Sequence, residues 1–414
     1  MSLKHYNKNI LILGAGEGQV PLILRAKEAG WHVIVVSPQG NYPGFALADE
    51  VEYCDIADSE AVLDIAKEYK TDAIATDQTD VSVNAVQYVS QELGIAAIQC
   101  ENINNFRDKS RMRELCQNAG IKTIPYLVTN ETDEIKRFFH SINSSVIIKP
   151  IDSQGSRGVT KVQSVSELQE AINEAMGYSK KKKVIVEQFI DGQEVEVDTV
   201  IYQDEIKAVL IGDVFNFESI QIFSAYERIY PSQLPETTQD EIRRVNAQTL
   251  KVLGLHTGWT HGEYMVSKDG DVYLLEVGAR GGGNYIGSDI VKTMIGVSTD
   301  EMAFRTAIGD ESFYKEVGLT NKCCAYKCFC IPEGTISKID IDEAWLNSDI
   351  VLRHNLEGLH VGKVCHRTTD KTTRYTVIVV ADNHVQLRQI MNNIPNKIII
   401  EVTTKQGKEN CIWQ

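Results

Sequence analysis

The first hundred residues alternate between short apolar runs and segments with helical periodicity. Asn9–Leu13 and Trp31–Ser37 are apolar runs of strand length, and the apolar positions of Gln19–Gly30 repeat with a helical period. The alternation continues as helix, strand, helix and strand in Ser59–Tyr69, Asp72–Ala75, Val81–Leu93 and Ile95–Ile98. Strands that alternate with helices predict βαβ units and a parallel sheet. We therefore expect an N-terminal Rossmann-like α/β domain over residues 1–105.

Residues 106–315 carry a different pattern, in which several strands follow one another directly. Three consecutive strand patterns occupy Val184–Phe189, Glu194–Tyr202 and Ile206–Gly212. A later pair of strands flanks an Asp-Gly step at Asp269, which is a strong hairpin signal. Residues 316–414 contain short strands and one helix, Val385–Asn393. We expect a central α+β domain over 106–315 and a small C-terminal α+β domain over 316–414.

Composition limits the classes of partner. The 414 residues carry 42 Lys and Arg against 57 Asp and Glu, a net charge of −15, which disfavours nucleic acid and anionic membranes as partners. No apolar run approaches the roughly 20 residues of a membrane span, and the N-terminus lacks a signal-peptide pattern, so we expect a cytoplasmic protein. Nine scattered cysteines predict thiols, and the cluster at Cys323, Cys324, Cys328 and Cys330 predicts a buried strand.

Two glycine-containing loops follow strands. Gly14-Ala-Gly-Glu-Gly18 is similar to a dinucleotide fingerprint, but its third glycine comes one residue early and no acidic residue ends the next strand. A nicotinamide-dependent oxidoreductase is therefore a weaker alternative, and a tight strand-to-helix turn is favoured. The second loop follows Lys149, which closes an apolar strand. A cation beside exposed amides suits a polyphosphate, and the N–H groups of Gly155, Ser156 and Gly158 are candidate donors.

Carboxylates on strands form a third group. Glu187 and Glu194 lie seven residues apart, and Glu263 and Glu276 stand on the two strands of the predicted hairpin. A carboxylate within an apolar strand is costly unless it has a partner, and facing carboxylates are natural ligands for Mg²⁺ that bridges nucleotide phosphates. Arg280 follows Glu276 by four residues and would bring a fixed positive charge to the same place.

The order of these motifs resembles the ATP-grasp superfamily of carboxylate–amine and carboxylate–thiol ligases, over roughly residues 1–310. The resemblance implies a central ATP-grasp domain of two α+β lobes that uses ATP with Mg²⁺ or Mn²⁺. It assigns Lys109, Lys149 and the glycine-rich lid at 152–158 to the phosphates. It assigns Glu187 and the main chain of Phe189 and Ile190 to the adenine, and Glu194 to the ribose. Glu263 and Glu276 would bind the metal, and Arg280 would hold the transferred phosphoryl group.

One position departs from the family pattern. Many members have the motif E-x-N-x-R, whose asparagine completes the metal site, but this chain has Gly278 there. Either Asn284 or a water molecule fills the gap, or one metal ion is held weakly. We expect retained activity.

The resemblance implies a ligase that joins a carboxylate, such as an amino acid, to an amine through an acyl phosphate, releasing ADP and phosphate. Positioning and charge neutralisation suffice for this chemistry, and no covalent protein nucleophile is needed. His261 lies two residues before Glu263 and is a candidate catalytic residue. A purine-biosynthesis ligase or carboxylase is the alternative. The expected partners are small-molecule carboxylate and amine substrates, and a homodimer is left open.

Overall fold

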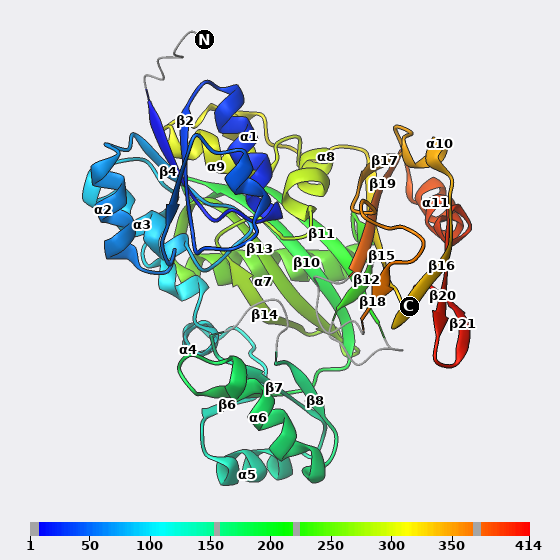
Figure 1. Cartoon of the computed structure of the whole chain (residues 1–414). Coiled ribbons are helices and arrows are strands. Elements are labelled where there is room, and N and C mark those ends of the chain that lie inside the picture. Colours follow the sequence, from blue (N-terminus) through cyan, green and yellow to red (C-terminus); the bar gives the residue numbers. More distant parts are fainter. Residues whose placement is uncertain (1–7, 153–157, 218–223, 367–373) are drawn as a thin grey trace.

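The computed structural model describes residues 8–152, 158–217, 224–366 and 374–414 (Figure 1). Its N-terminal part contains β1 (Asn9–Leu13), α1 (Val20–Glu28), β2 (His32–Ser37), β3 (Glu50–Tyr53), α2 (Ser59–Glu68), β4 (Ala73–Ala75) and α3 (Val83–Leu93). The four strands form a parallel sheet in the order β3-β2-β1-β4. This arrangement confirms the predicted α/β sheet and adds β3, which the periodicity did not indicate.

Both faces of this sheet are covered, which explains why β1 and β2 are continuous apolar runs. Ile10 and Ile12 belong to a core that includes α1. Leu11 and Leu13 point to the other face and pack with residues of α2 and α3. A parallel strand that is buried on both faces needs apolar side chains at successive positions.

The predicted strand at Ile95–Ile98 is wrong. The strand is instead β5 (Gln99–Cys100), which pairs antiparallel with β13 (Leu255–Ser267) of the large sheet. Ile98 packs against two of the hydrophobic cores. The run is apolar because it packs between the N-terminal layer and the large sheet, and a short apolar run does not by itself distinguish a strand from a packed loop.

A small lobe follows α4 (Lys109–Asn118) and stands apart from the rest at the bottom of Figure 1. Its four strands pair antiparallel in the order β6-β9-β7-β8, and two helices pack with this sheet around one core. The elements are β6 (Tyr126–Thr129), α5 (Thr132–Ile142), β7 (Val146–Pro150), β8 (Thr160–Val162), α6 (Leu168–Tyr178) and β9 (Val184–Gln188).

A large antiparallel sheet forms the centre of the molecule. In spatial order its strands are β14 (Val272–Gly278), β13, β10 (Gly192–Tyr202), β11 (Glu205–Asn216), β12 (Ala225–Tyr230), β15 (Cys323–Cys330), β19 (Arg374–Ala381) and β17 (Val351–His354). The long helix α7 (Glu236–Leu253) packs with β10 and β13 in one core. Helices α8 (Val291–Ile295) and α9 (Thr299–Ala307) join the core that also contains α1.

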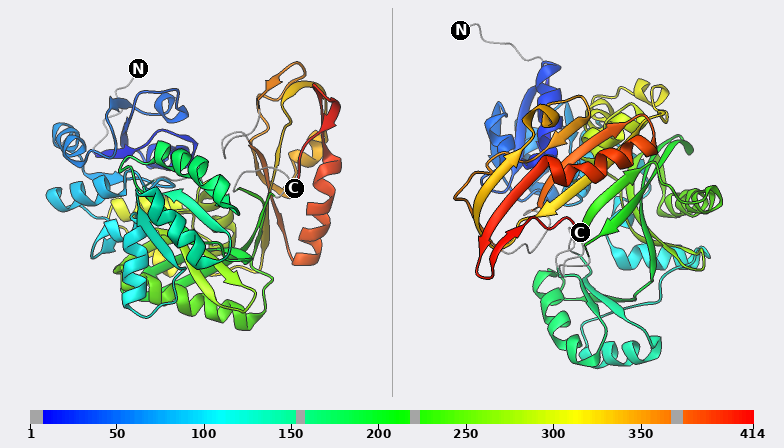
Figure 2. Two further views of the ribbon diagram at one scale, coloured as in Figure 1. Left: turned by 90° about the horizontal axis from the view of Figure 1, so that it is seen from below. Right: turned by 90° about the vertical axis from the view of Figure 1, so that its right-hand side faces the viewer.

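The C-terminal strands β15, β19 and β17 extend this large sheet, and a second sheet lies beyond them (Figure 2). That sheet and its helices comprise β16 (Gly334–Ile341), α10 (Glu343–Leu346), β18 (Val364–Cys365), α11 (His384–Lys397), β20 (Ile398–Thr404) and β21 (Gly407–Asn410). The four clustered cysteines are buried within β15, as the sequence predicts. Among the described residues, no helix combines the length and apolar character needed to cross a membrane.

Candidate active site

Lys109 and Glu276, 167 positions apart in the chain, meet in a salt bridge. Lys109 begins α4, whose first turn is capped by the Asp108 side chain, and it is 5% exposed. Its Nζ lies 3.0 Å from Glu276 Oε1 on β14. Glu276 is the register partner of Glu263 on the adjacent strand β13. The structure therefore brings a predicted phosphate-binding lysine together with the two predicted metal-binding glutamates.

A second lysine is fixed by a buried carboxylate. Glu187 on β9 is 2% exposed and lies between two cations, with Lys149 Nζ at 2.6 Å and Arg113 Nη2 at 2.8 Å. Burial alone would raise the pKa of Glu187, but the charges of Arg113 and Lys149 lower it to about 2. The side chain of Glu187 thus positions Lys149. After β9 the chain continues through Phe189, whose N–H donates to the Ser145 carbonyl at 2.9 Å.

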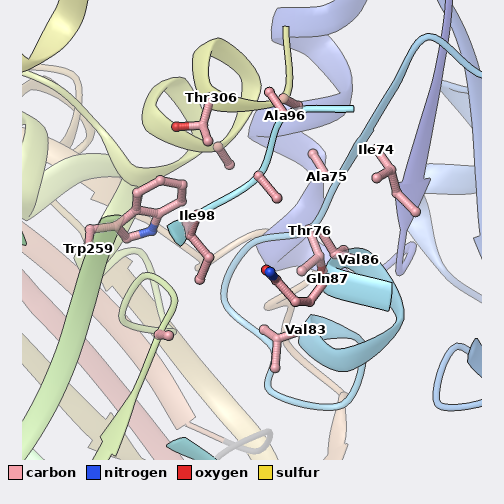
Figure 3. Close-up of a pocket in the computed structure, with 14 residues that line it drawn as sticks. Ile74, Ala75, Thr76, Val83, Val86, Gln87, Ala96, Ile98, Trp259 and Thr306 are labelled. Atoms are coloured by element: carbon pink, nitrogen blue, oxygen red, sulfur yellow. The ribbon is translucent and has the colours of Figure 1, made fainter. Parts of the chain in front are cut away.

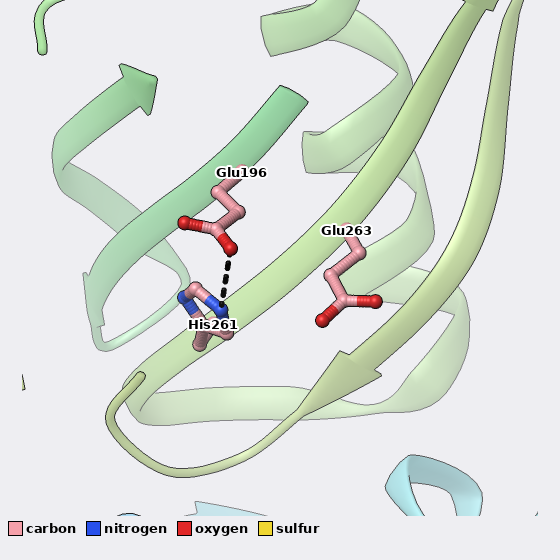
Figure 4. A group of neighbouring side chains, drawn as sticks. All are labelled: Glu196, His261 and Glu263. Carbon is pink, nitrogen blue, oxygen red and sulfur yellow. Dashed lines mark ion pairs between the residues drawn. The ribbon is translucent and has the colours of Figure 1, made fainter. Parts of the chain in front are cut away.

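A row of carboxylates lines β10 because alternate residues of a strand share one face. Glu194, Glu196 and Asp198 occupy this row, and Glu196 and Asp198 are the register partners of Glu263 and His261 on β13. His261 Nδ1 lies 2.9 Å from Asp198 Oδ1, and its Nε2 lies 3.9 Å from Glu196 Oε1 (Figure 4). Ligand atoms of Glu196, His261 and Glu263 all lie within 4.8 Å of one another.

The charge of each of these groups follows from its neighbours. Arg228 Nε donates to Glu196 at 2.7 Å, and the Tyr230 hydroxyl donates to the other oxygen at 2.5 Å. Burial would raise the pKa of Glu196, but Arg228 and His261 lower it to about 2. Burial would lower the pKa of His261, but Asp198 raises it above its usual range.

Glu194 has a different environment from Glu196. Its Oε2 accepts a hydrogen bond from Asn216 Nδ2 at 2.6 Å. Burial and the negative charge of Glu263 raise its pKa, although the Asn216 hydrogen bond acts in the opposite direction. Glu194 and Glu263 therefore repel each other, and a divalent cation bound near them would compensate their negative charge.

Arg280 is held by Asp80, a residue that the sequence motifs did not predict. Its Nε donates to Asp80 Oδ1 at 2.9 Å and its Nη2 to Asp80 Oδ2 at 2.7 Å. Asp80 follows β4 and is 4% exposed. The sequence carries no signal for this contact, because the pair is separated by 200 positions. By contrast, the alternation of acidic residues at 194, 196 and 198 could have predicted the roles of Glu196 and Asp198 beside Glu194.

Not all of the predicted phosphate loop is described. Gly155 and Ser156 lie outside the described residues. Gly158, where the description resumes, has φ +69°, and a Cβ there would lie 2.8 Å from the Tyr178 ring and 3.2 Å from Pro150. Glycine is required at this position by both conformation and space.

The first glycine loop is crossed by the side chain of Gln19. Gly14 adopts φ +98°, and a Cβ there would lie 2.9 Å from Gln19 Oε1. The Gln19 side chain crosses the turn, accepting from Gly16 N at 3.1 Å and donating to the Asp77 carbonyl at 2.6 Å. This side chain occupies the place where a pyrophosphate would meet the loop amides, which disfavours the oxidoreductase alternative.

A separate cavity lies between the N-terminal layer and the large sheet (Figure 3). It is lined by Ile98, Trp259 and Thr306 among others, and its volume is about 40 Å³. That volume holds only a few water molecules. It is therefore too small for the proposed substrates.

The central part of the chain is similar to a known family of ligases. Residues 115–284 match the family model of the D-ala D-ala ligase C-terminus. A D-alanine–D-alanine ligase from Trichlorobacter lovleyi is 31% identical over 161 residues, which are 38% of this chain and 50% of the relative. The chain spans about half the length of the curated relatives it matches.

Solved structures match over nearly the whole chain. An L-amino acid ligase from Bacillus licheniformis has a TM-score of 0.79 at 21% identity, covering 96% of this chain and all of that one (100%). A phosphoribosylglycinamide synthetase from Anaerococcus prevotii has a TM-score of 0.74 at 22% identity, covering 95% and 99%. The fold is thus the ATP-grasp fold, and the resemblance predicted from the motif order is confirmed. The central segment of the chain is similar to the D-alanine–D-alanine ligases.

Proposed function

We propose that this protein is an ATP-dependent ligase that joins the carboxylate of an amino acid or a similar acid to an amine. The observation that carries the proposal is the salt bridge between Lys109 and Glu276 at 3.0 Å, beside Glu263 and Arg280. Cationic groups for phosphates and paired carboxylates for a divalent metal meet there from two distant segments of the chain, the start of α4 and the hairpin of β13 and β14. This donor set suits ATP with Mg²⁺ or Mn²⁺.

The lysines would bind the nucleotide phosphates, and the glutamates would bind the metal ion. Lys109 and Lys149 would exchange their carboxylate partners for nucleotide phosphates, as suits cations that are already desolvated. Glu263 and Glu276 would hold the magnesium, which neutralises phosphate charge when bound. The predicted hinge at Phe189 and Ile190 would receive the adenine, and Glu194 would accept hydrogen bonds from the ribose.

The proposed reaction proceeds in two steps. The substrate carboxylate attacks the γ-phosphate of ATP, forming an acyl phosphate and releasing ADP. The amine then attacks the acyl carbon, forming an amide and releasing phosphate. Arg280, held by Asp80, would stabilise the charge on the transferred phosphoryl group. Asp198 raises the pKa of His261, and the protonated imidazole would contribute a further positive charge near the substrate carboxylate.

The second candidate is a purine-biosynthesis type of ligase, which the likeness to a phosphoribosylglycinamide synthetase favours. A screen that measures ADP release with pairs of amino acids and small amines, alongside ribosylamine phosphates, tests both. We expect Mg²⁺-dependent ADP release with an amino-acid pair. Turnover only with a ribosylamine phosphate would favour the second candidate. ATP hydrolysis without any product amide would contradict both.

A further inference from the structure

Two adjoining cavities lie between the N-terminal layer and the large sheet. The inner cavity is the small one of Figure 3, and the outer cavity, of about 470 Å³, shares Gln87, Thr306 and residues 96–98 with it. Helix α3, the segment 94–101, the start of β13, α9 and the residues that follow α9 line the outer cavity. Its volume is in the range of small-molecule sites, about 300–1,000 Å³. Among the described residues that line the two cavities, none is assigned above to ATP, the metal or the phosphoryl group.

Buried polar atoms on these walls have no hydrogen-bond partner among the described residues. They are Gln87 Oε1 and Ser90 Oγ on α3, and Trp259 Nε1 on β13. Ser90 is 3% exposed and Trp259 is 5% exposed. Buried polar atoms are normally hydrogen-bonded to protein or to ordered water, so an unpartnered atom beside a cavity marks a place for a ligand or for solvent. Trp259 lines the inner cavity, where water fits, whereas Ser90 lines the outer cavity, which has room for an organic molecule.

Gln87 and Ser90 belong to one face of α3. Residues three apart on a helix are neighbours on its surface, and both of these residues line the outer cavity. Figure 3 shows Gln87 and Trp259 on opposite sides of Ile98. A side-chain amide oxygen only accepts hydrogen bonds, and a hydroxyl can accept as well as donate. The two oxygens therefore suit one ligand group that carries two or more N–H donors.

The charges on the lining favour a cation over an anion. No lysine or arginine is among the described residues that line the outer cavity, whereas Glu101 and Glu311 are exposed carboxylates there. His256 offers no free cation, because its Nδ1 lies 2.7 Å from Asp204 Oδ1 and its Nε2 lies 3.8 Å from Glu101 Oε1. A carboxylate or phosphate ligand would lose its hydration without gaining a positive partner. A cation would be attracted by the two glutamates.

We propose that the outer cavity is a binding site for a small organic amine with an apolar body. The ammonium group donates hydrogen bonds to Gln87 Oε1 and Ser90 Oγ, and the apolar part packs against Ile95 and Ile98. The carboxylates of Glu101 and Glu311 attract the positive charge to the cavity. This inference goes beyond the proposed function, because the cavity contains none of the residues assigned to ATP.

Calorimetric titration without nucleotide tests the inference, with phenethylamine as the probe. Phenylacetate and phenylacetamide carry the same ring with an anionic and a neutral group. We expect saturable one-to-one binding of phenethylamine to the wild type and no binding of phenylacetate. Phenylacetamide should bind about tenfold more weakly than the amine, because its hydrogen bonds are not assisted by a charge.

Gln87→Met and Ser90→Ala locate the bound probe. Each variant removes one acceptor and should weaken phenethylamine binding by about tenfold, on the scale of a hydrogen bond to a charged group. Both variants should fold, because each removes an atom that has no partner among the described residues. Gln169→Met is the matched control, since this glutamine is exposed on α6 of the small lobe. It should bind phenethylamine as the wild type does.

Any of three results would overturn the inference. The first is a wild type that shows no saturable binding of phenethylamine. The second is equal affinity in the wild type, Gln87→Met and Ser90→Ala, which would place the amine elsewhere, such as in the candidate active site. The third is phenylacetate or phenylacetamide binding as tightly as phenethylamine. These measurements need no nucleotide, so their outcome is independent of whether the protein is an ATP-dependent ligase.

Discussion

Lys149 and Glu187 form an ion pair at 2.6 Å that joins the neighbouring strands β7 and β9 of the small lobe. Arg113 of α4 contacts the same carboxylate at 2.8 Å and also donates to the Leu275 carbonyl on β14 at 2.8 Å. This group of three charges therefore links the small lobe to the large sheet. The same contacts that position the predicted phosphate-binding lysine also join the small lobe to the large sheet.

Glu187→Gln should destabilise the protein strongly. The substitution keeps the shape but leaves Arg113 and Lys149 buried without a negative partner. Breaking a buried ion pair from one side costs about 3–5 kcal/mol. Urea unfolding at neutral pH measures the change. Glu205→Gln, which removes an exposed pair with Lys207, is the control and should leave the midpoint unchanged. Equal midpoints for both variants would contradict a structural role for Glu187.

Lys149→Met should act mainly on nucleotide binding. The variant keeps the apolar stem of the side chain, and Arg113 still neutralises Glu187, so we expect a smaller loss of stability than in Glu187→Gln. The dissociation constant for ADP or a non-hydrolysable ATP analogue should rise, because the proposed phosphate contact of the lysine would be made in the ground state. Calorimetric titration measures it. Unchanged nucleotide affinity would remove Lys149 from the phosphate site.

Glu276→Gln should act mainly on the chemical step. The glutamine keeps the shape of the side chain and removes one charge from the proposed metal site. We expect turnover to fall by about 10²-fold or more, on the scale of a lost electrostatic contact to the transition state. Single-turnover ADP formation at saturating Mg²⁺ and ATP measures it. If this variant formed ADP at the wild-type rate, Glu276 would not be a metal ligand.

Asp77 should make the stability of the protein depend on pH. Burial and the charge of Asp300 raise its pKa to about 7 from an ordinary value of 3.8, against hydrogen bonds from Thr299 and Gly281. Between those values the unfolded chain has released the proton while the folded chain keeps it. Its contribution to stability is therefore full below about pH 4. It falls as the pH rises to about 7 and is constant above that.

Asp77→Asn tests this dependence, because the amide has the same shape and cannot ionise; its oxygen can accept from Gly281 N and its NH2 group can donate to Thr299 Oγ1. The free energy of unfolding of the wild type minus that of the variant should fall steadily between pH 4.5 and pH 7, with a limiting slope of about 1.4 kcal/mol per pH unit. Urea unfolding at four pH values measures the difference. Parallel curves for the two proteins would mean that Asp77 is ionised throughout this range.

The elements of the fold could be predicted wherever the local pattern sufficed. Strand β1 was predicted with its observed bounds, because both of its faces are buried and the apolar run is continuous. The hairpin of β13 and β14 was predicted from its Asp-Gly turn. Ile95–Ile98 was mispredicted as a strand. A buried loop and a buried strand both require apolar residues, so a short apolar run does not distinguish them.

The sequence by itself determined which residues could carry the chemistry, through residue type and order: Lys109, Lys149, Glu263, Glu276 and Arg280. It did not determine their partners. Asp80 reaches Arg280 and Glu187 reaches Arg113 across 200 and 74 positions, and no local period encodes such contacts. Only the tertiary structure decided that a glycine at position 278 makes room for an aspartate from another layer, because that fit depends on how the parallel sheet packs against β14.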